Sequence, residues 1–352
     1  MAGLGHKHTM HKSKILAAAL FLAVFCGGAD FSPVQAQSAA PGNLIEAAKK
    51  DGAVVWYTTT SNEDNQAVVN GFNRKYPFVK VQILRTTGEK LRERILTEAS
   101  AGQNFFDVAV MSGMELGLVK SRNLFQPYRS PEAAVYPSGA KDREGYFTGI
   151  YARNFVLAYN KNLTPDKAAP RDWPDLLKPE WKEKLGLEEE EFEWYGALID
   201  YWGREKTVKF MKALAAQKPQ LRRGHTLLAQ LLAAGEFPVA IVFPQQIEQL
   251  KAKGARVEWV RSSDPIVTSI NGIAVSAKAR HPGAATLFVD FTLSADGQTA
   301  IRDRFRVPVR PGIPPAAPSL EQSNLKLHYV AGDMFQKISQ YEREYREIFW
   351  GK

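Results

Sequence analysis

The fold class is indicated by Ala53-Val54-Val55-Trp56-Tyr57 and by the polar loop after it, Thr58-Thr59-Thr60-Ser61. The first five residues are apolar, β-branched or aromatic, which is typical of a strand that is buried on both faces. Thr60 and Glu63 have the T-x-x-E spacing of a helix capping box. The stretch therefore predicts a buried strand that passes through a polar loop into a helix.

Strand and helix patterns alternate along the next 60 or so residues. The first helix is predicted to stop at Pro77. A strand over Val79–Leu84, a helix over Glu89–Ala101, a strand over Asp107–Met111 and a helix over Met114–Lys120 follow. This order predicts an α/β fold with a doubly wound parallel sheet.

Near residue 150 the pattern changes, because Tyr146–Tyr151 and Phe155–Tyr159 resemble strands with no long helix between them. Ile266–Ala277 returns to a strand pattern. Two chain crossings, near residues 150 and 265, indicate two lobes with a cleft between them. We expect lobe 1 to contain residues 37–150 plus 266–312, and lobe 2 to contain residues 151–265 plus 313–352. Further helices are predicted over Trp194–Tyr201, Glu205–Ala216, Thr226–Ala234, Ala284–Leu293 and Lys337–Phe349, and further strands over Pro238–Phe243 and Val257–Val260.

The N-terminal 36 residues have the layout of a secretory signal peptide. Basic residues precede an apolar run, Ile15–Phe25, and Val34-Gln35-Ala36 places small residues at a cleavage point. The run is well short of the roughly 20 residues that span a bilayer. We predict export to the periplasm with residues 1–36 removed; Cys26 leaves lipidation as an alternative.

Removal of that segment changes the composition. The whole chain has 352 residues, a formal net charge of +9 and one Cys; residues 37–352 carry +7 and no Cys. Thiol nucleophiles, Cys-bound zinc, iron–sulfur clusters and disulfides are thereby excluded. The chain has no G-x-S-x-G elbow, P-loop, H-E-x-x-H motif or EF-hand loop. We therefore expect a protein that is not an enzyme, with no cofactor and no metal site.

Positive charge is spread along the chain rather than gathered in one stripe. The longest basic cluster, Arg302, Arg304, Arg306 and Arg310, is interleaved with Asp303, Phe305 and prolines. We interpret it as a solvated basic face and predict no nucleic-acid partner.

Polar loops after two predicted strands are the first candidate ligand contacts. They are Thr58-Thr59-Thr60-Ser61 and Ser112-Gly113. Ligands of open α/β sheets bind beyond the carboxyl ends of the strands, and the following helix N-termini attract anions. Both loops are also compatible with simple helix caps.

Four other features have a functional and a structural interpretation each. Arg153, in a strand-like crossing, is a ligand contact or a structural ion pair. His225 is a ligand contact or a capping or surface histidine. The acidic run Glu188–Glu193 is a cation site or a solvated first helical turn. Trp194-Tyr195-Gly196 lines a pocket or belongs to the core.

Several motifs follow one another in a characteristic order. After Val54-Val55-Trp56-Tyr57 come Phe106-Asp107-Val108 with Ser112, Tyr159-Asn160-Lys161-Asn162-Leu163, Trp173-Pro174-Asp175-Leu176-Leu177, Pro179-Glu180-Trp181-Lys182-Glu183-Lys184, Gly235-Glu236-Phe237-Pro238-Val239-Ala240, and Phe288-Val289-Asp290-Phe291 with Ser294, Gly297 and Gln298. Over residues 44–312 this series resembles the ferric-binding-protein-like branch of periplasmic solute-binding proteins. The resemblance implies a two-lobed type II periplasmic-binding-protein fold. It also implies a small-molecule ligand and delivery to an ABC permease in the inner membrane; we expect a monomer.

The family's iron ligands do not carry over to this sequence. Where ferric binders have adjacent tyrosines, this chain has Pro244-Gln245-Gln246, and the Thr58–Ser61 run replaces the histidine of the first loop. Arg153 matches a position where similar proteins contact an anion, and Trp194–Gly196 lies near their second anion-binding loop.

From these matches we expect a small anionic or polar organic solute, such as a carboxylate or phosphonate. Arg153 would pair with its acidic group, and the Thr59–Ser61 and Ser112–Gly113 loops would donate hydrogen bonds. Trp194, Gln245 and His225 would close from the other lobe. Binding of ferric iron or an iron chelate, and a role as a ligand-sensing partner of a membrane receptor, are the alternatives.

Overall fold

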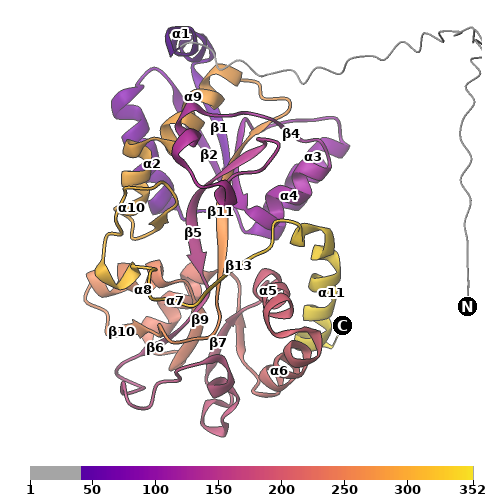
Figure 1. The fold of residues 1–352 in the computed structure, drawn as a ribbon, viewed down its shortest axis with the longest axis vertical. Helices are drawn as coiled ribbons and strands as arrows, with labels where there is room; N and C mark the ends of the chain where they lie inside the picture. Colours follow the sequence, from indigo (N-terminus) through magenta and orange to yellow (C-terminus); the bar gives the residue numbers. More distant parts are fainter. Residues whose placement is uncertain (1–40, 352) are drawn as a thin grey trace, which may run out of the picture. The chain divides into compact units, whose positions relative to one another are not determined.

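The computed structural model describes residues 41–351, so the signal peptide predicted over residues 1–36 lies outside the described residues. No helix of residues 41–351 is both long enough and apolar enough to cross a membrane. These residues form two lobes, each built around one sheet (Figure 1).

Lobe 1 is built around an eight-stranded sheet with the main strand order β12-β5-β11-β3-β1-β2, in which β13 and β4 pair with β11 off this path. Strand β1 pairs in parallel with both β2 and β3, whereas β11 pairs antiparallel with β3 and β5. The parallel arrangement predicted for the first three strands is confirmed. The strands are β1 (Ala53–Thr58), β2 (Lys80–Arg85), β3 (Val108–Ser112), β4 (Phe125–Gln126), β5 (Phe147–Asn154), β11 (Ile266–Ser276), β12 (Val307–Pro308) and β13 (Leu327–Tyr329).

Both faces of this sheet are buried, as the apolar run in β1 predicts. Successive side chains of a strand point to opposite faces. Trp56 packs in one apolar cluster with Phe72 and Phe288, and Tyr57 packs in a second cluster with Leu91. Helices α2 (Asn62–Lys75) and α9 (Pro282–Leu293) cover the first face, and α3 (Gly88–Ser100) and α4 (Gly113–Ser121) cover the second. Helices α1 (Pro41–Asp51) and α10 (Ala295–Arg302) pack against α9 and α2.

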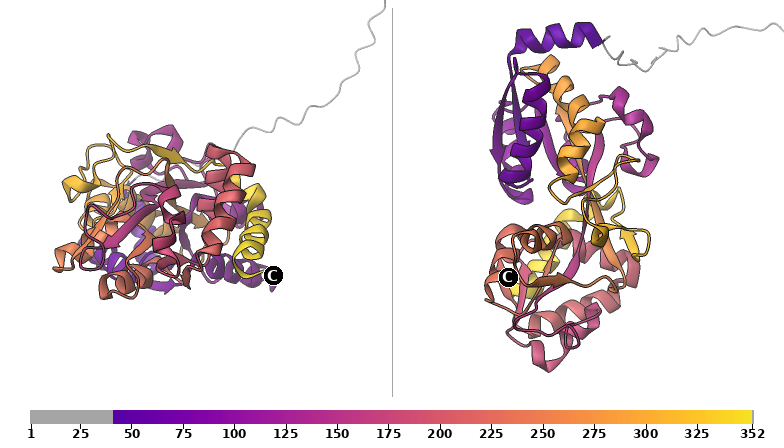
Figure 2. Two further views of the ribbon diagram at one scale, coloured as in Figure 1. Left: turned by 90° about the horizontal axis from the view of Figure 1, so that it is seen from below. Right: turned by 90° about the vertical axis from the view of Figure 1, so that its left-hand side faces the viewer.

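Lobe 2 is built around a five-stranded sheet of strand order β10-β6-β9-β7-β8. These strands are β6 (Val156–Asn160), β7 (Leu185–Glu188), β8 (Gln220–Arg222), β9 (Val239–Val242) and β10 (Val257–Trp259). Helices α5 (Phe192–Trp202), α6 (Arg204–Ala216) and α11 (Ile338–Trp350) pack on one side, and α7 (His225–Ala234) and α8 (Pro244–Ala252) on the other. In Figure 2 the C-terminal helix α11, in yellow, lies beside the helices of lobe 2, in agreement with its packing on α5 and α6.

The chain passes between the two sheets where strand segments follow one another without a helix. Strand β5 is separated from β6 only by Phe155, and residues 260–265 connect β10 to β11. The C-terminal segment contributes to both lobes, because β13 joins the lobe 1 sheet while α11 packs on lobe 2. Six 3₁₀ helices complete the described secondary structure: Pro131–Val135, Ser138–Ala140, Trp173–Leu177, Pro179–Trp181, Pro318–Leu320 and Met334–Lys337.

Two local predictions need correction. The cap of α2 is Ser61, whose side chain accepts a hydrogen bond from the Asp64 amide, rather than Thr60. The basic cluster at residues 302–310 is also not a uniformly solvated face. Arg306 is buried, and its Nε donates to Asp64 Oδ2 at 2.7 Å because a carboxylate of α2 lies opposite it.

Candidate functional site

A cavity of about 140 Å³ lies between the two lobes and is lined by residues of both. Lobe 1 contributes the segments that follow β1, β2 and β3, and lobe 2 contributes the ends of β7 and β9 and the first turns of α7 and α8. This is the place where open α/β sheets bind ligands. Six of the twelve predicted ligand contacts line the cavity: Thr59, Ser61, Ser112, Arg153, His225 and Gln245.

The hydroxyl groups of the lobe 1 wall are held at helix N-termini. Ser61 Oγ caps α2, and Ser112 Oγ caps α4 by accepting from the Glu115 amide at 3.3 Å. A serine that accepts in this way keeps its own hydroxyl hydrogen for another acceptor. Both groups can therefore donate into the cavity, and their short side chains are fixed by the caps.

The other residues of these two loops do not line the cavity. Thr58 is completely buried, and its hydroxyl accepts from the Thr60 amide at 3.0 Å. The Thr60 hydroxyl is 2.8 Å from the hydroxyl of Tyr151. Gly113, the first residue of α4, is also absent from the lining. These residues position the loops and are turned away from the cavity.

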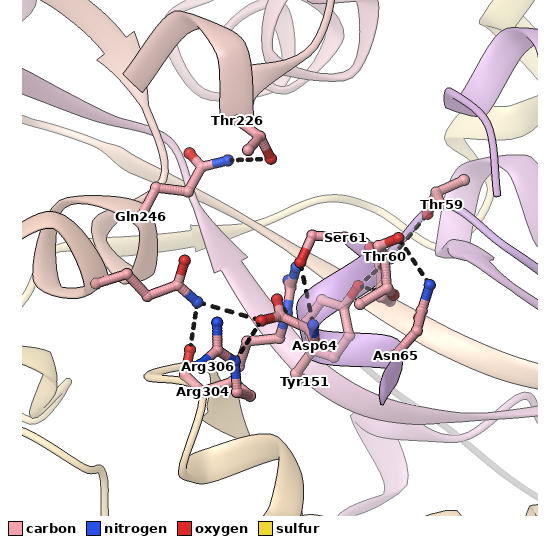
Figure 3. Close-up of polar contacts among 12 residues, drawn as sticks. Thr59, Thr60, Ser61, Asp64, Asn65, Tyr151, Thr226, Gln246, Arg304 and Arg306 are labelled. Atoms are coloured by element: carbon pink, nitrogen blue, oxygen red, sulfur yellow. Dashed lines mark hydrogen bonds and ion pairs between the residues drawn. The ribbon is translucent and has the colours of Figure 1, made fainter. Parts of the chain in front are cut away.

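Tyr151 links the Thr59–Ser61 loop, whose residues Figure 3 shows near it, to Asn271 of β11. Asn271 Nδ2 donates to the Tyr151 hydroxyl at 2.8 Å and lies 3.4 Å from Thr59 Oγ1. Asn271 is 1% exposed, and its Oδ1 has no hydrogen-bond partner among the described residues. Asn271 is not among the contacts predicted from the sequence, although an amide within the apolar run Ile266–Ala277 is a signal that could have identified it.

Arg153 is already engaged in an ion pair. Its Nη2 donates to Glu193 Oε2 at 2.5 Å and to Ser269 Oγ at 3.0 Å, while Ser269 Oγ donates to Glu193 Oε1 at 2.7 Å. The guanidinium also lies over the ring of Phe243, 5.2 Å from the centroid. Of its two interpretations, the geometry matches the structural ion pair.

Trp194, Tyr195 and Gly196 lie in the core of lobe 2 and do not line the cavity, contrary to the expectation from sequence. Trp194 is completely buried with its ring 5.1 Å from that of Trp173. The Tyr195 hydroxyl donates to Glu344 at 2.8 Å. These three residues do not line the cavity because they lie on the side of α5 that packs against α6 and α11.

His225 begins α7 and forms part of the lobe 2 wall. Its ring stacks on Phe243 with a centroid separation of 4.0 Å, and its Nε2 is 2.7 Å from Glu191 Oε1. Burial lowers the pKa of His225 to about 4. The ring is therefore neutral near pH 7, and it can hydrogen-bond to Glu191 but does not neutralise a carboxylate.

The acidic run is buried rather than solvated, which corrects one of its two interpretations. Glu188 ends β7, and Glu188, Glu191 and Glu193 are 4%, 2% and 6% exposed. With Glu190 they form the acidic wall of the cavity. The apolar run Leu185-Gly186-Leu187 before it was a signal that these carboxylates follow a buried strand.

Burial disfavours the charged form of a carboxyl group. It raises the pKa of Glu188 to about 7, with Glu191 adding to the effect, and it raises the pKa of Glu191 well above its usual range. The pKa of Glu190 is raised to about 8 by burial and by the neighbouring Glu188 and Glu89. Within residues 41–351, however, no group of three or more His, Cys, Asp or Glu side chains is arranged to hold a metal ion.

Gln245 lies on the first turn of α8, directly after Pro244. It is 4% exposed, and its Nε2 has no hydrogen-bond partner among the described residues. Its neighbour Gln246 also lines the cavity, where its Nε2 is 3.5 Å from the Thr226 hydroxyl (Figure 3).

The chain is similar to known periplasmic binding proteins. It is 24% identical over 268 residues to an Fe(3+)-binding periplasmic protein of Serratia marcescens, covering 73% of this chain and 78% of the relative. It is 27% identical over 272 residues to the "Probable ABC transporter periplasmic-binding protein y4fP" of Sinorhizobium fredii, covering 70% and 72%.

A solved structure supports the fold. The periplasmic binding protein AfuA of Actinobacillus pleuropneumoniae, with fructose-6-phosphate bound, superposes with a TM-score of 0.78 at 20% identity, covering 85% of this chain and 98% of AfuA. Residues 103–336 match the model of the family described as bacterial extracellular solute-binding protein. The two-lobed fold, the cavity between the lobes and this match together show that the chain belongs to the bacterial extracellular solute-binding protein family.

Proposed function

We propose that the protein is the periplasmic substrate-binding component of an ABC transporter. It captures a small polar organic solute between its lobes and delivers it to a membrane permease. The family match and the names of the relatives from Serratia and Sinorhizobium support this role.

The observation that carries the proposal is the cavity whose wall is shared by both lobes. Thr59 and Ser112 face it from lobe 1, and Thr226 and Gln245 from lobe 2. A solute that contacts both walls binds the closed arrangement better than an open one, and it shifts the population toward closure by that difference in affinity.

Capture is tested by a thermal-shift screen of the purified protein, expressed with its own N-terminal segment, against carboxylates, phosphonates, polyamines, sugar phosphates and ferric chelates. A ligand at 100 times its Kd should add roughly 2.7 kcal/mol of stability. If none of these classes stabilises the protein, capture of a small polar solute is contradicted.

The position of the bound solute is tested by Thr226→Trp, because an indole at this lining position fills the cavity. We expect this variant to lose the ligand-induced shift. The neighbouring Leu227 is 44% exposed and does not line the cavity, so Leu227→Trp is the matched control and should keep the shift. A full shift in Thr226→Trp would place the solute elsewhere.

Export and delivery need separate measurements. The intact mass of protein from the periplasmic fraction should correspond to a chain that begins at Gln37, and a full-length cytoplasmic protein would contradict export. The liganded protein should crosslink in cells to an ABC permease and stimulate its ATPase. Crosslinking to a membrane receptor instead would replace the import role by ligand sensing.

A further inference from the structure

The charge of the cavity wall identifies the class of solute, on the assumption that the proposed function holds. We infer that the cavity selects a small organic cation with hydrogen-bond donors, an ammonium, amidinium or guanidinium group, and that the carboxylates of Glu188 and Glu191 receive it. This differs from the anionic solute that the position of Arg153 suggested.

The cavity wall contains more acidic than basic side chains. Six glutamates line the cavity, namely Glu89, Glu115, Glu188, Glu190, Glu191 and Glu193, against three arginines. Two of the arginines are engaged by carboxylates: Arg153 pairs with Glu193, and Arg306 pairs with Asp64, as Figure 3 shows. The third, Arg85, is solvent-exposed, so water and salt screen its charge.

Some of these glutamates pair with a basic side chain, and others do not. Glu193 pairs with Arg153, Glu115 with Arg92 and Glu89 with Arg346. Glu190 lies 3.4 Å from Arg223 and close to Glu89.

Neither Glu188 nor Glu191 forms an ion pair with a Lys or Arg side chain among the described residues; the charge of Arg153, which Glu193 holds, acts on Glu191 but does not prevent its pKa from being raised. Glu188 accepts from the amides of Gly224 and Glu190, and Glu191 contacts the neutral His225. Buried carboxylates without a countercharge are costly, and a cation placed between them offsets that cost.

The hydrogen-bonding groups of the wall give information that does not depend on its charge. Asn271 and Gln245 line the cavity from opposite lobes, are at least 96% buried, and each has an amide atom without a partner. The Nδ2 of Asn271 is committed to Tyr151, so its free atom is the acceptor Oδ1. This buried acceptor fits a solute that brings N–H groups, whereas the free atom of Gln245 is the donor Nε2, which suits an acceptor atom elsewhere on the same solute.

The cavity wall also contains aromatic side chains. Phe155, Phe192 and Phe243 line the cavity, and ring faces attract cations. Arg153 shows the same combination within the protein, because its guanidinium lies over Phe243 while Glu193 holds it. Because His225 stacks on Phe243 and Arg153 lies over it, these rings support the wall, and the carboxylates supply the contacts for the cation.

The inference is tested by calorimetry and thermal shift with putrescine, agmatine and arginine as cationic probes, and citrate, phosphonoacetate, inorganic phosphate and ferric citrate as contrasts. We expect at least one cationic probe to bind and stabilise the protein, and the contrasts not to do so. Stabilisation by the contrasts alone would overturn the inference and leave the proposed function intact. No stabilisation by any probe would overturn both.

Variants locate the cation within the wall. Glu191→Gln keeps the shape of the protonated carboxyl group but cannot become charged, and it should weaken binding of the cationic probe at least tenfold. Glu189→Gln is the matched control, because Glu189 belongs to the same segment, does not line the cavity and pairs with Arg223. Equal affinity in both variants would contradict the assignment of the cation to Glu191.

Arg153 separates the two charge classes directly. Arg153→Met removes a positive charge from the cavity wall and releases Glu193 from its ion pair, so it should tighten binding of the cationic probe. Loss of probe binding in a variant whose circular dichroism and unfolding remain cooperative would overturn the inference. Glu188→Gln provides a second measurement if Glu191→Gln does not fold, with the same expected loss.

Discussion

At the scale of residues, the chemical role of a side chain depends on its surroundings in the folded protein more than on its neighbours in the sequence. Arg153 and Glu193 lie 40 positions apart, and they form an ion pair because β5 and the start of α5 meet at the cavity. His225 is uncharged near neutral pH because it is buried. Four successive acidic positions, Glu188–Glu191, become buried or half-buried because they follow a strand that is inside lobe 2.

The stability of the unliganded protein should fall between about pH 6.5 and 8. Glu188 has a pKa of about 7 in the folded protein, above its usual 4.5, so its stabilising contribution is complete below 4.5 and is lost as pH rises through 7. The lowered pKa of His225 makes the stability rise with pH instead, but this rise is nearly complete above about pH 6.5. Between pH 6.5 and 8 Glu190, with its pKa of about 8, accounts for most of the decline, and Glu188 contributes the smaller part because most of its loss occurs below pH 6.5.

The measurement is urea unfolding of the unliganded protein at several pH values. The pKa shift of Glu188 corresponds to about 3 kcal/mol in all, of which roughly 1 kcal/mol is lost between pH 6.5 and 8. Glu190→Gln should remove most of the decline and Glu188→Gln a smaller part, whereas Glu189→Gln should keep it. A stability that rises from pH 6.5 to 8 would show that these carboxyl groups are charged in the folded state at pH 6.5.

At the scale of elements, hydrophobic patterning predicts the long strands and helices well. Strands β1, β3 and β9 are continuous apolar runs, and their positions agree with the predictions within two residues at either end. The four-residue β7 and the three-residue strands β8 and β13 were not predicted, because each mixes apolar residues with glycine or polar ones, unlike the equally short but wholly apolar β9. They form because the neighbouring strands β9, β7 and β11 offer free edges.

The contact between α3 and α11 gives a test at this scale. Arg92 of α3 is buried and pairs with Glu115 of α4 and Glu342 of α11, the latter at 2.7 Å. Removing one partner of a buried ion pair leaves an uncompensated charge, at a cost of about 3 kcal/mol. Arg92→Met should therefore destabilise the protein by roughly that amount in denaturant unfolding.

Arg94→Met is the matched control on the same helix. The Arg94 side chain is 49% exposed and pairs with Glu98 at i,i+4, so its loss should cost below about 1 kcal/mol. Equal effects of the two substitutions would show that the Arg92 cluster contributes no more than an exposed pair.

At the scale of the whole molecule, contacts between the lobes decide how the cavity is closed. Gln249 of α8 donates to Asp64 Oδ1 of α2 at 3.2 Å and to the Arg304 carbonyl oxygen at 2.7 Å. Asp64 is buried and also holds Arg304 and Arg306 (Figure 3). The carboxylate of Asp64 is thus shared between the lobes.

Gln249→Ala should raise the Kd of the bound solute several-fold, because each net hydrogen bond that favours the closed arrangement contributes about 1 kcal/mol. The effect should appear in calorimetry without a change in the cavity wall, since Gln249 does not line it. Lys253→Ala, at an exposed position after the same helix, should leave the Kd unchanged. An unchanged Kd in Gln249→Ala would mean that this contact is equally present in the open state.

By itself the sequence determined the alternation of strands and helices, the two chain crossings and the polar loops at strand ends. These depend on local periodicity and on turn residues, which are read from neighbouring positions. Only the tertiary structure decided that Arg153 is paired, that Trp194 belongs to the core and that Glu188 and Glu191 are buried without a Lys or Arg ion-pair partner. Burial and ion pairing arise between residues far apart in the chain, such as Arg92 and Glu342, which are 250 positions apart. A pattern within one segment cannot specify such contacts.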